Sequence, residues 1–235
     1  MDTVTALMAE MVAGHGNDTA IIYHDEPITY AELDDMSRRA ATVLADLGVG
    51  PGDRVALWLP NCPAYVALCL GCCRLGAIAV AVNTRFRSTE VSDIVSRVGA
   101  EIMVMWPGFR EIDFLALLAE AEPEALACLK TIILYDEGQK VDEIPTAVAH
   151  CRRLHYNDLI QCPPYDDDHG DPDAGCKIFT TSGTTKAPKF VLHSQGSISR
   201  HARLVADGFG YSTSQGALLQ MMPLCGVFGF SQIMA

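Results

Sequence analysis

The chain has 235 residues, 49% hydrophobic and 20% charged, and its 17 Lys and Arg against 29 Asp and Glu give a formal net charge of −12. This composition excludes a disordered chain, a collagen-like chain and a heptad rod. An acidic chain without a basic stripe is also a poor partner for nucleic acid or an anionic membrane surface. The sequence therefore predicts a soluble globular protein whose ligand is a small anionic molecule.

The N-terminal segment and the cysteines indicate a cytoplasmic protein. Residues 1–16 contain no Lys or Arg, whereas a secretory signal needs a basic start and an apolar stretch. The nine cysteines lack the spacing of a small disulfide-bonded domain, so we expect reduced thiols. Cys69, Cys72 and Cys73 could be a metal cluster, but their spacing in an apolar run favours the buried face of a helix. No metal site is predicted.

The regular elements begin with a capping box, in which Thr29 and Glu32 can satisfy each other's backbone N–H groups. The helix that follows keeps an apolar 3.6-residue period to Leu47, and Gly48 ends it. Short apolar runs then alternate with amphipathic segments. We expect strands at 55–59, 77–82, 102–106 and 131–135, and helices at 63–75, 88–98 (capped by Ser88 or Thr89) and 114–126.

This alternation predicts parallel strands joined by crossover helices. The strands are apolar throughout because helices cover both faces of such a sheet. The predicted fold class is α/β, a doubly wound and mostly parallel sheet with flanking helices.

Two segments interrupt the alternation. Residues 161–174 carry prolines, a glycine and five aspartates and are expected to form an acidic, solvated connector. Residues 166–169 within it could bind a metal, but they lack the spacing of a calcium loop. Residues 217–235 are uncharged and nearly long enough to span a bilayer, yet polar residues, Pro and Gly interrupt them. We expect a buried strand followed by a turn there, and no transmembrane segment.

The segment with the clearest chemistry is TSGTTKAPK, residues 181–189, between expected strands at 176–180 and 190–193. Gly183 permits a tight turn that exposes backbone N–H groups to an anion. The neighbouring hydroxyls add donors and two lysines add positive charge. The alternative is a hydroxyl-rich hairpin turn with solvated lysines. The glycine spacing matches neither a Walker A loop nor a dinucleotide-binding motif.

These nine residues resemble the T-S-G-T-T-G-x-P-K phosphate loop of the adenylate-forming (AMP-binding) superfamily, which includes acyl- and aryl-CoA synthetases, luciferases and peptide-synthetase adenylation domains. The resemblance covers nearly the whole chain. It implies that residues 1–235 are an incomplete N-terminal AMP-binding (adenylation) domain, part of the large domain of such an enzyme. Blocks that resemble the family's other N-terminal landmarks, in their usual order, are residues 28–33, 47–55, 59–61, 75–78 and 82–86.

The resemblance implies a two-step reaction. A carboxylate attacks the α-phosphate of Mg-ATP to give acyl-AMP and pyrophosphate, and a thiol, usually that of CoA, then displaces AMP. The implied partners are therefore a small carboxylic acid, ATP, Mg²⁺ and CoA. The family's magnesium-binding Glu, ribose-binding Asp and catalytic Lys are expected beyond residue 235, so no catalytic residue or metal ligand is assigned here. The residues assigned to the ATP phosphates are Thr181, Ser182, Gly183, Thr184, Thr185, Lys186 and Lys189.

The chain departs from the family pattern at three positions. Lys186 and Phe190 replace glycines, and Gly226 replaces the histidine of a P-L-x-H-x-x-G block that borders the acyl pocket in relatives. Gly226, Val227 and Phe228 are the residues assigned to the acid pocket. His193 matches a histidine often found after the loop, and a structural role is favoured for it.

We therefore predict the N-terminal portion of an ATP-dependent acid–thiol ligase that is not active alone. The alternative is a non-catalytic nucleotide- or polyphosphate-binding module, or half of a split enzyme. Residues 82–86 favour fatty or aryl acids over amino acids by resemblance only. The acid itself, the acceptor thiol and the oligomeric state stay open.

Overall fold

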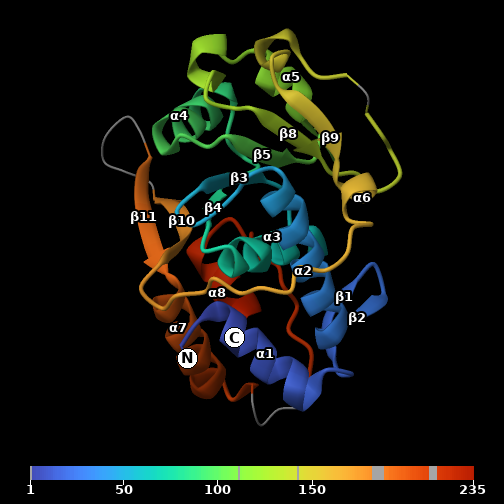
Figure 1. Ribbon diagram of the computed structural model, residues 1–235, viewed down its shortest axis with the longest axis vertical. Coiled ribbons are helices and arrows are strands. Elements are labelled where there is room, and N and C mark those ends of the chain that lie inside the picture. Colours follow the sequence, from blue (N-terminus) through green and yellow to red (C-terminus); the bar gives the residue numbers. More distant parts are fainter. Residues whose placement is uncertain (1, 111, 142, 182–187, 212–215) are drawn as a thin grey trace.

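The computed structural model describes residues 2–110, 112–141, 143–181, 188–211 and 216–235. Its centre is a seven-stranded sheet in the order β11-β10-β4-β3-β5-β8-β9 (Figure 1). Neighbouring strands run parallel except for β11, which pairs antiparallel with β10 at one edge. The strands are β3 (Arg54–Trp58), β4 (Ile78–Ala81), β5 (Ile102–Met105), β8 (Thr131–Leu134), β9 (Arg152–His155), β10 (Gly175–Thr181) and β11 (Lys189–Ser194).

Helices cover both faces of this sheet. On β3, Val55 and Leu57 belong to the core beneath α2 (Tyr30–Asp46) and α3 (Pro63–Arg74), whereas Ala56 and Trp58 belong to the opposite core. α4 (Ser88–Val98) and α5 (Phe114–Ala119) cover that second face. The predicted doubly wound α/β fold is therefore confirmed, with each predicted parallel strand present to within two residues.

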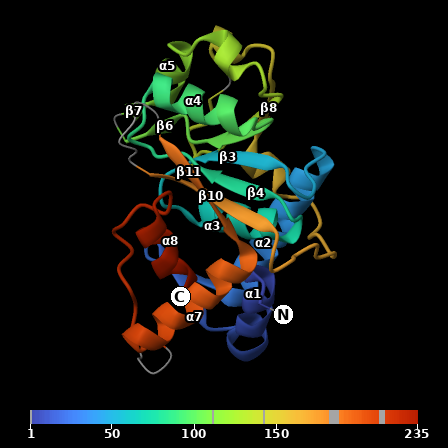
Figure 2. The ribbon, with the colours of Figure 1, turned by 90° about the vertical axis from the view of Figure 1, so that its left-hand side faces the viewer.

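The remaining elements were not predicted from the sequence. α1, α7 and α8 lie together beyond α2 and α3, on the same side of the sheet (Figures 1 and 2). β9 extends the sheet with the arginine-rich, half-exposed segment that lacks an apolar pattern. These elements are α1 (Val4–His15), the hairpins β1 (Thr19–Tyr23) with β2 (Glu26–Thr29) and β6 (Gly108–Phe109) with β7 (Ile112–Asp113), the 3₁₀ helices η1 (Pro123–Leu126) and η2 (Thr146–Val148), α6 (Tyr156–Leu159), α7 (Gln195–Phe209) and α8 (Val227–Met234).

One helix start is confirmed and another is wrong. The capping box of α2 is present, with Glu32 N 3.2 Å from Thr29 Oγ1 and Thr29 N 2.8 Å from Glu32 Oε2. The expected cap of α4 at Ser88 or Thr89 is wrong, since Arg87 is the cap residue and Ser88 already lies in the helix. The carboxylate of Glu90 accepts the Arg87 N–H at 3.0 Å, which satisfies the start of α4 without a hydroxyl cap.

The helix expected at 114–126 is shorter than predicted. α5 ends at Ala119, and a separate 3₁₀ turn begins at Pro123. Proline has no N–H and disfavours a helical conformation in the residue before it, and Glu122 is indeed extended, with φ −66° and ψ 123°.

The buried strand expected within 217–235 is also wrong. The described residues from 216 onward contain no strand, and Val227–Met234 forms α8. A Cβ atom on Gly229 would lie 2.3 Å from the carbonyl oxygen of Pro223, so only glycine lets α8 fold back this closely. Leu219 and Met221, expected inside, are 77% and 79% exposed. Among the described residues, no helix is long and apolar enough to cross a membrane.

The acidic connector at 161–174 runs along α2 without helix or strand. Arg38 Nε donates to the carbonyl oxygen of Tyr165 at 2.8 Å, and Thr42 Oγ1 donates to that of Pro163 at 2.8 Å. Arg38 also pairs with Asp166. One arginine therefore balances part of the connector's charge and holds it near the helix.

The close approach of α2 and α3 yields a stability prediction. A Cβ atom on Gly71 would lie 2.9 Å from Ala41 N and 3.0 Å from Ser37 O on α2. Gly71→Ala should therefore lower the free energy of unfolding by about 1–3 kcal/mol through overpacking. Gly14 in α1 has open space around it, so Gly14→Ala should raise stability by about 0.5–1 kcal/mol. Urea titration measures both, and equal midpoints for the two variants would contradict this packing.

Candidate functional site

The predicted phosphate loop connects the two strands of an antiparallel hairpin. Thr181, the last residue of β10, pairs opposite Lys189, the first residue of β11, and both side chains are exposed. Because β10 runs parallel to β4, this hairpin end lies at the carboxyl end of the parallel strands, the edge where doubly wound folds bind ligands. The predicted residues Ser182, Gly183, Thr184, Thr185 and Lys186 lie outside the described residues.

Arg97 of α4 holds the returning end of this segment. Its Nη1 donates to the carbonyl oxygen of Pro188 at 2.9 Å, and its guanidinium lies 4.2 Å from the ring centroid of Phe190. Asp93, one helical turn earlier, fixes the same guanidinium at 2.8 Å. Phe190, at a position where the resembled motif has glycine, therefore provides a stacking surface that glycine lacks. The role of Arg97 was not predicted from the sequence.

Asn61 anchors the segment that leads into the expected acid pocket. Its Nδ2 donates to the carbonyl oxygen of Met222 at 2.9 Å, and its Oδ1 accepts the N–H of Leu224 at 2.8 Å. Asn61 follows β3 at the same carboxyl edge of the sheet. Two motifs that the sequence separates by 161 residues therefore meet in space.

The residues assigned to the acid pocket lie at the start of α8. Gly226 is the N-cap residue, and the side chains of Val227 and Phe228 are largely exposed. α8 packs beside β10 through an edge-to-face contact of Phe230 with Phe179, at a centroid distance of 5.6 Å. The structure thus brings the helix that holds the predicted pocket residues next to the strand that enters the predicted phosphate loop.

Two histidines, His193 and His201, lie near this helix and make structural contacts. His193 on β11 lies edge-to-face with Phe179 at 5.5 Å. Burial, and to a lesser degree the charge of His201, lowers the pKa of His193 below its ordinary value. His201 Nε2 and Ser231 Oγ lie 2.6 Å apart and connect α7 to α8.

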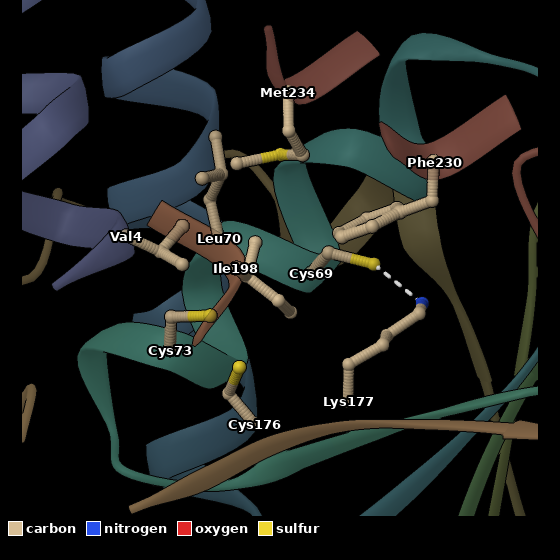
Figure 3. Close-up of a pocket in the computed structure, with 9 residues that line it drawn as sticks. All are labelled: Val4, Cys69, Leu70, Cys73, Cys176, Lys177, Ile198, Phe230 and Met234. Atoms are coloured by element: carbon tan, nitrogen blue, oxygen red, sulfur yellow. Dashed lines mark hydrogen bonds between the residues drawn. The ribbon is translucent and has the colours of Figure 1, made fainter. Parts of the chain in front are cut away.

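A buried lysine lies between β10, α3 and α8 (Figure 3). Lys177 Nζ donates to Tyr65 Oη at 2.8 Å and to Cys69 Sγ at 3.0 Å, and it lies 4.8 Å from the ring centroid of Phe230. Cys69 and its neighbours Cys72 and Cys73 occupy the buried face of α3, as predicted. Lys177 was predicted only as a member of the strand at 176–180, although a lysine between apolar strand residues is itself an unusual signal.

The ionisation of this cluster follows from burial and proximity. Burial raises the pKa of the Cys69 thiol, and the nearby Lys177 ammonium opposes that rise. Burial lowers the pKa of Lys177, but Cys69 and Tyr65 together outweigh it and hold the pKa above its ordinary value. The adjoining cavity, about 10 Å³ in volume, leaves no room for a substrate.

Comparison with known proteins identifies the family. The model of the AMP-binding enzyme family matches residues 8–235, so the chain belongs to this family. It is 33% identical over 231 residues to 3-[(3aS,4S,7aS)-7a-methyl-1,5-dioxo-octahydro-1H-inden-4-yl]propanoyl:CoA ligase of Mycobacterium tuberculosis, covering 97% of this chain and 43% of that protein. It is 30% identical over 200 residues to 3-hydroxybenzoate–CoA/4-hydroxybenzoate–CoA ligase of Thauera aromatica, covering 85% and 36%.

Solved structures agree on the fold. The acetoacetyl-CoA synthetase of Streptomyces lividans superposes with a TM-score of 0.80 at 23% identity, over 98% of this chain and 36% of that one. The N-terminal domain of FACL13 from Mycobacterium tuberculosis gives 0.74 at 25% identity, over 100% and 54%. The chain spans less than half the length of the two curated relatives above.

The contacts of Asn61 predict how its loss affects the pocket segment. Asn61→Ala removes two hydrogen bonds to residues 222–224, each contributing about 0.5–1.5 kcal/mol, so the Leu224 amide should exchange with solvent about tenfold faster. Asn83→Ala is the matched control, because Asn83 Oδ1 accepts only the local Arg85 N–H at 2.9 Å among the described contacts. Hydrogen exchange measures both variants. Equal rates at Leu224 in Asn61→Ala and the parent would refute the anchoring role.

Proposed function

We propose that this chain is the N-terminal portion of an ATP-dependent acid–thiol ligase. The reaction joins a carboxylic acid to ATP as acyl-AMP with release of pyrophosphate, and then transfers the acyl group to a thiol, with CoA as the acceptor. Membership of the AMP-binding enzyme family and CoA ligases among its relatives support this proposal.

The observation that carries the proposal is the register of the β10–β11 hairpin. Because Thr181 pairs opposite Lys189, the two ends of the predicted loop lie side by side at the carboxyl edge of the sheet. A short connection rich in hydroxyls and backbone N–H groups suits phosphate oxygens there. Bound ATP would supply the electrophilic phosphorus and the leaving pyrophosphate.

Within this proposal, the chain's own residues bind and orient the phosphates. Residues 181–185 donate hydrogen bonds to them, and Lys186 and Lys189 neutralise charge that collects on the leaving group. Arg97 fixes the position of Pro188 and so of the adjacent Lys189. Mg²⁺ enters the proposal only as the partner of ATP, and no ligand for it is assigned in this chain.

The proposed acid site is the start of α8, at Gly226, Val227 and Phe228. Glycine in place of the family histidine removes a polar side chain and leaves space beside two apolar ones. One relative, of Mycobacterium tuberculosis, is a long-chain-fatty-acid–CoA ligase, and the relative of Thauera aromatica is a hydroxybenzoate–CoA ligase. These two names support a fatty or aryl acid as the substrate class.

Exposed apolar side chains support the proposal that the domain is incomplete. Leu204, Phe209, Leu219, Met221 and Phe228 are all more than half exposed and lie on or between α7 and α8. Apolar groups gathered this way normally pack against other protein. We infer that the C-terminal part of the adenylation domain and a C-terminal domain cover them in a longer, cytoplasmic enzyme.

The test is acid-dependent exchange of pyrophosphate into ATP by the full-length protein. Lys189→Ala should lower the exchange rate by roughly ten- to a hundredfold, because it removes a charged hydrogen-bond donor from the phosphates. Lys140→Ala should leave the rate unchanged, since Lys140 pairs with Asp158 of α6, next to β9 at the far edge of the sheet.

A non-catalytic nucleotide- or polyphosphate-binding module would give a different result. Tight ATP binding with no exchange for any fatty or aryl acid would reject the ligase and favour a nucleotide-binding role. An unchanged rate in Lys189→Ala would remove the role proposed for that lysine alone.

A further inference from the structure

Lys177 is buried at the junction of three elements. Its side chain is 1% exposed, and it lies four residues before Thr181 on the strand that enters the phosphate loop. Both hydrogen bonds go to α3, to Tyr65 and Cys69. The ammonium group also lies over the ring of Phe230 in α8, and Figure 3 shows Lys177 with Cys69 and Phe230. One side chain therefore touches all three elements.

Stability alone does not account for a lysine at this position. Among the described residues, its hydrogen-bond acceptors are a phenol and a thiol, and neither is a carboxylate. Removing a cation from water is costly, and well-packed apolar replacements of buried charges often leave stability unchanged or raise it. A methionine of similar length would fill the same space without that cost.

The contacts of Lys177 restrict where α8 can lie. Hydrogen bonds fix the ammonium group relative to α3, and its attraction to the Phe230 ring depends on the ring facing it. Phe230 follows the assigned pocket residues 226–228 within the same helix. Lys177 therefore connects the helix of the proposed acid pocket to the strand that enters the proposed phosphate loop.

We propose that Lys177 is a positioning residue that sets α8, and with it the acid pocket, relative to the phosphate loop. This inference rests on the proposed function for its kinetic consequence. Among the described contacts of Lys177, none reaches residues 226–228, so its effect on them passes through Phe230.

The decisive variant is Lys177→Met in the full-length protein. We expect the KM for the acid to rise about tenfold while the KM for ATP and the free energy of unfolding stay the same or improve, because misplacing one substrate by a fraction of an ångström is enough. Tyr65→Phe, which removes one acceptor and keeps the ring, should shift the acid KM in the same direction by less.

Ile178→Val is the matched control. Ile178 is the next residue on β10, and its side chain belongs to the opposite core, away from α8. It should change neither KM. A Lys177→Met protein with both KM values raised and a lowered melting temperature would show a merely structural role and overturn the proposal, as would an unchanged acid KM.

Hydrogen exchange separates failure of this proposal from failure of the proposed function. In Lys177→Met, the amides of residues 227–234 should exchange several-fold faster while those of α3 keep the parent rates. If the parent shows no acid-dependent exchange of pyrophosphate, the ligase assignment fails but this measurement still decides whether Lys177 positions α8. Unchanged rates in α8 would overturn the positioning role.

Discussion

The whole molecule depends on a parallel sheet that is buried on both faces. Each residue of β3 after Arg54 packs into one of the two cores, so helices occupy both sides of the strand. On β3, polar side chains are therefore confined to the ends of the strand. Asn61 follows β3 and Thr181 ends β10 at the same carboxyl edge. There the Asn61 side chain hydrogen-bonds to Met222 and Leu224, and Thr181 pairs with Lys189. The position of the candidate site is a consequence of the sheet's burial.

The sequence predicted those parts of the fold whose signals are local. Apolar runs of strand length mark the central strands, and the capping box joins two residues, Thr29 and Glu32, that are close in the sequence. Pro123 was also a local signal, and it should have divided the helix expected at 114–126. α8 could not be found in this way. Its path depends on Gly229 meeting the carbonyl groups of Met222 and Pro223, and an apolar segment of uniform hydropathy does not encode that contact.

The candidate site likewise has a part that local sequence signals reveal and a part that they do not. The loop at 181–189 was visible because its residue types follow one another in the chain, although residues 182–187 lie outside the part that the structure describes. The side chains that hold the loop and the pocket segment in place had no such signal in the sequence. Arg97 reaches Pro188 across 91 residues, and Asn61 reaches Met222 across 161. A side chain that acts on a distant backbone carbonyl leaves no periodic pattern, so only the folded chain reveals these two residues as part of the site.

Lys177 is a position whose proposed role the strand pattern did not reveal. Residues 176–180 were predicted only as a strand that leads into the loop, and the structure buries Lys177 within that strand. Side chains alternate along a strand, so Lys177 shares its face with Phe179 and projects toward α3 and α8, while Ile178 faces the other core. A buried lysine without a carboxylate partner costs stability, yet it forms directional contacts that aliphatic packing lacks. Core stability therefore favours an apolar residue at position 177, whereas the proposed placement of α8 favours a lysine, which is the residue present.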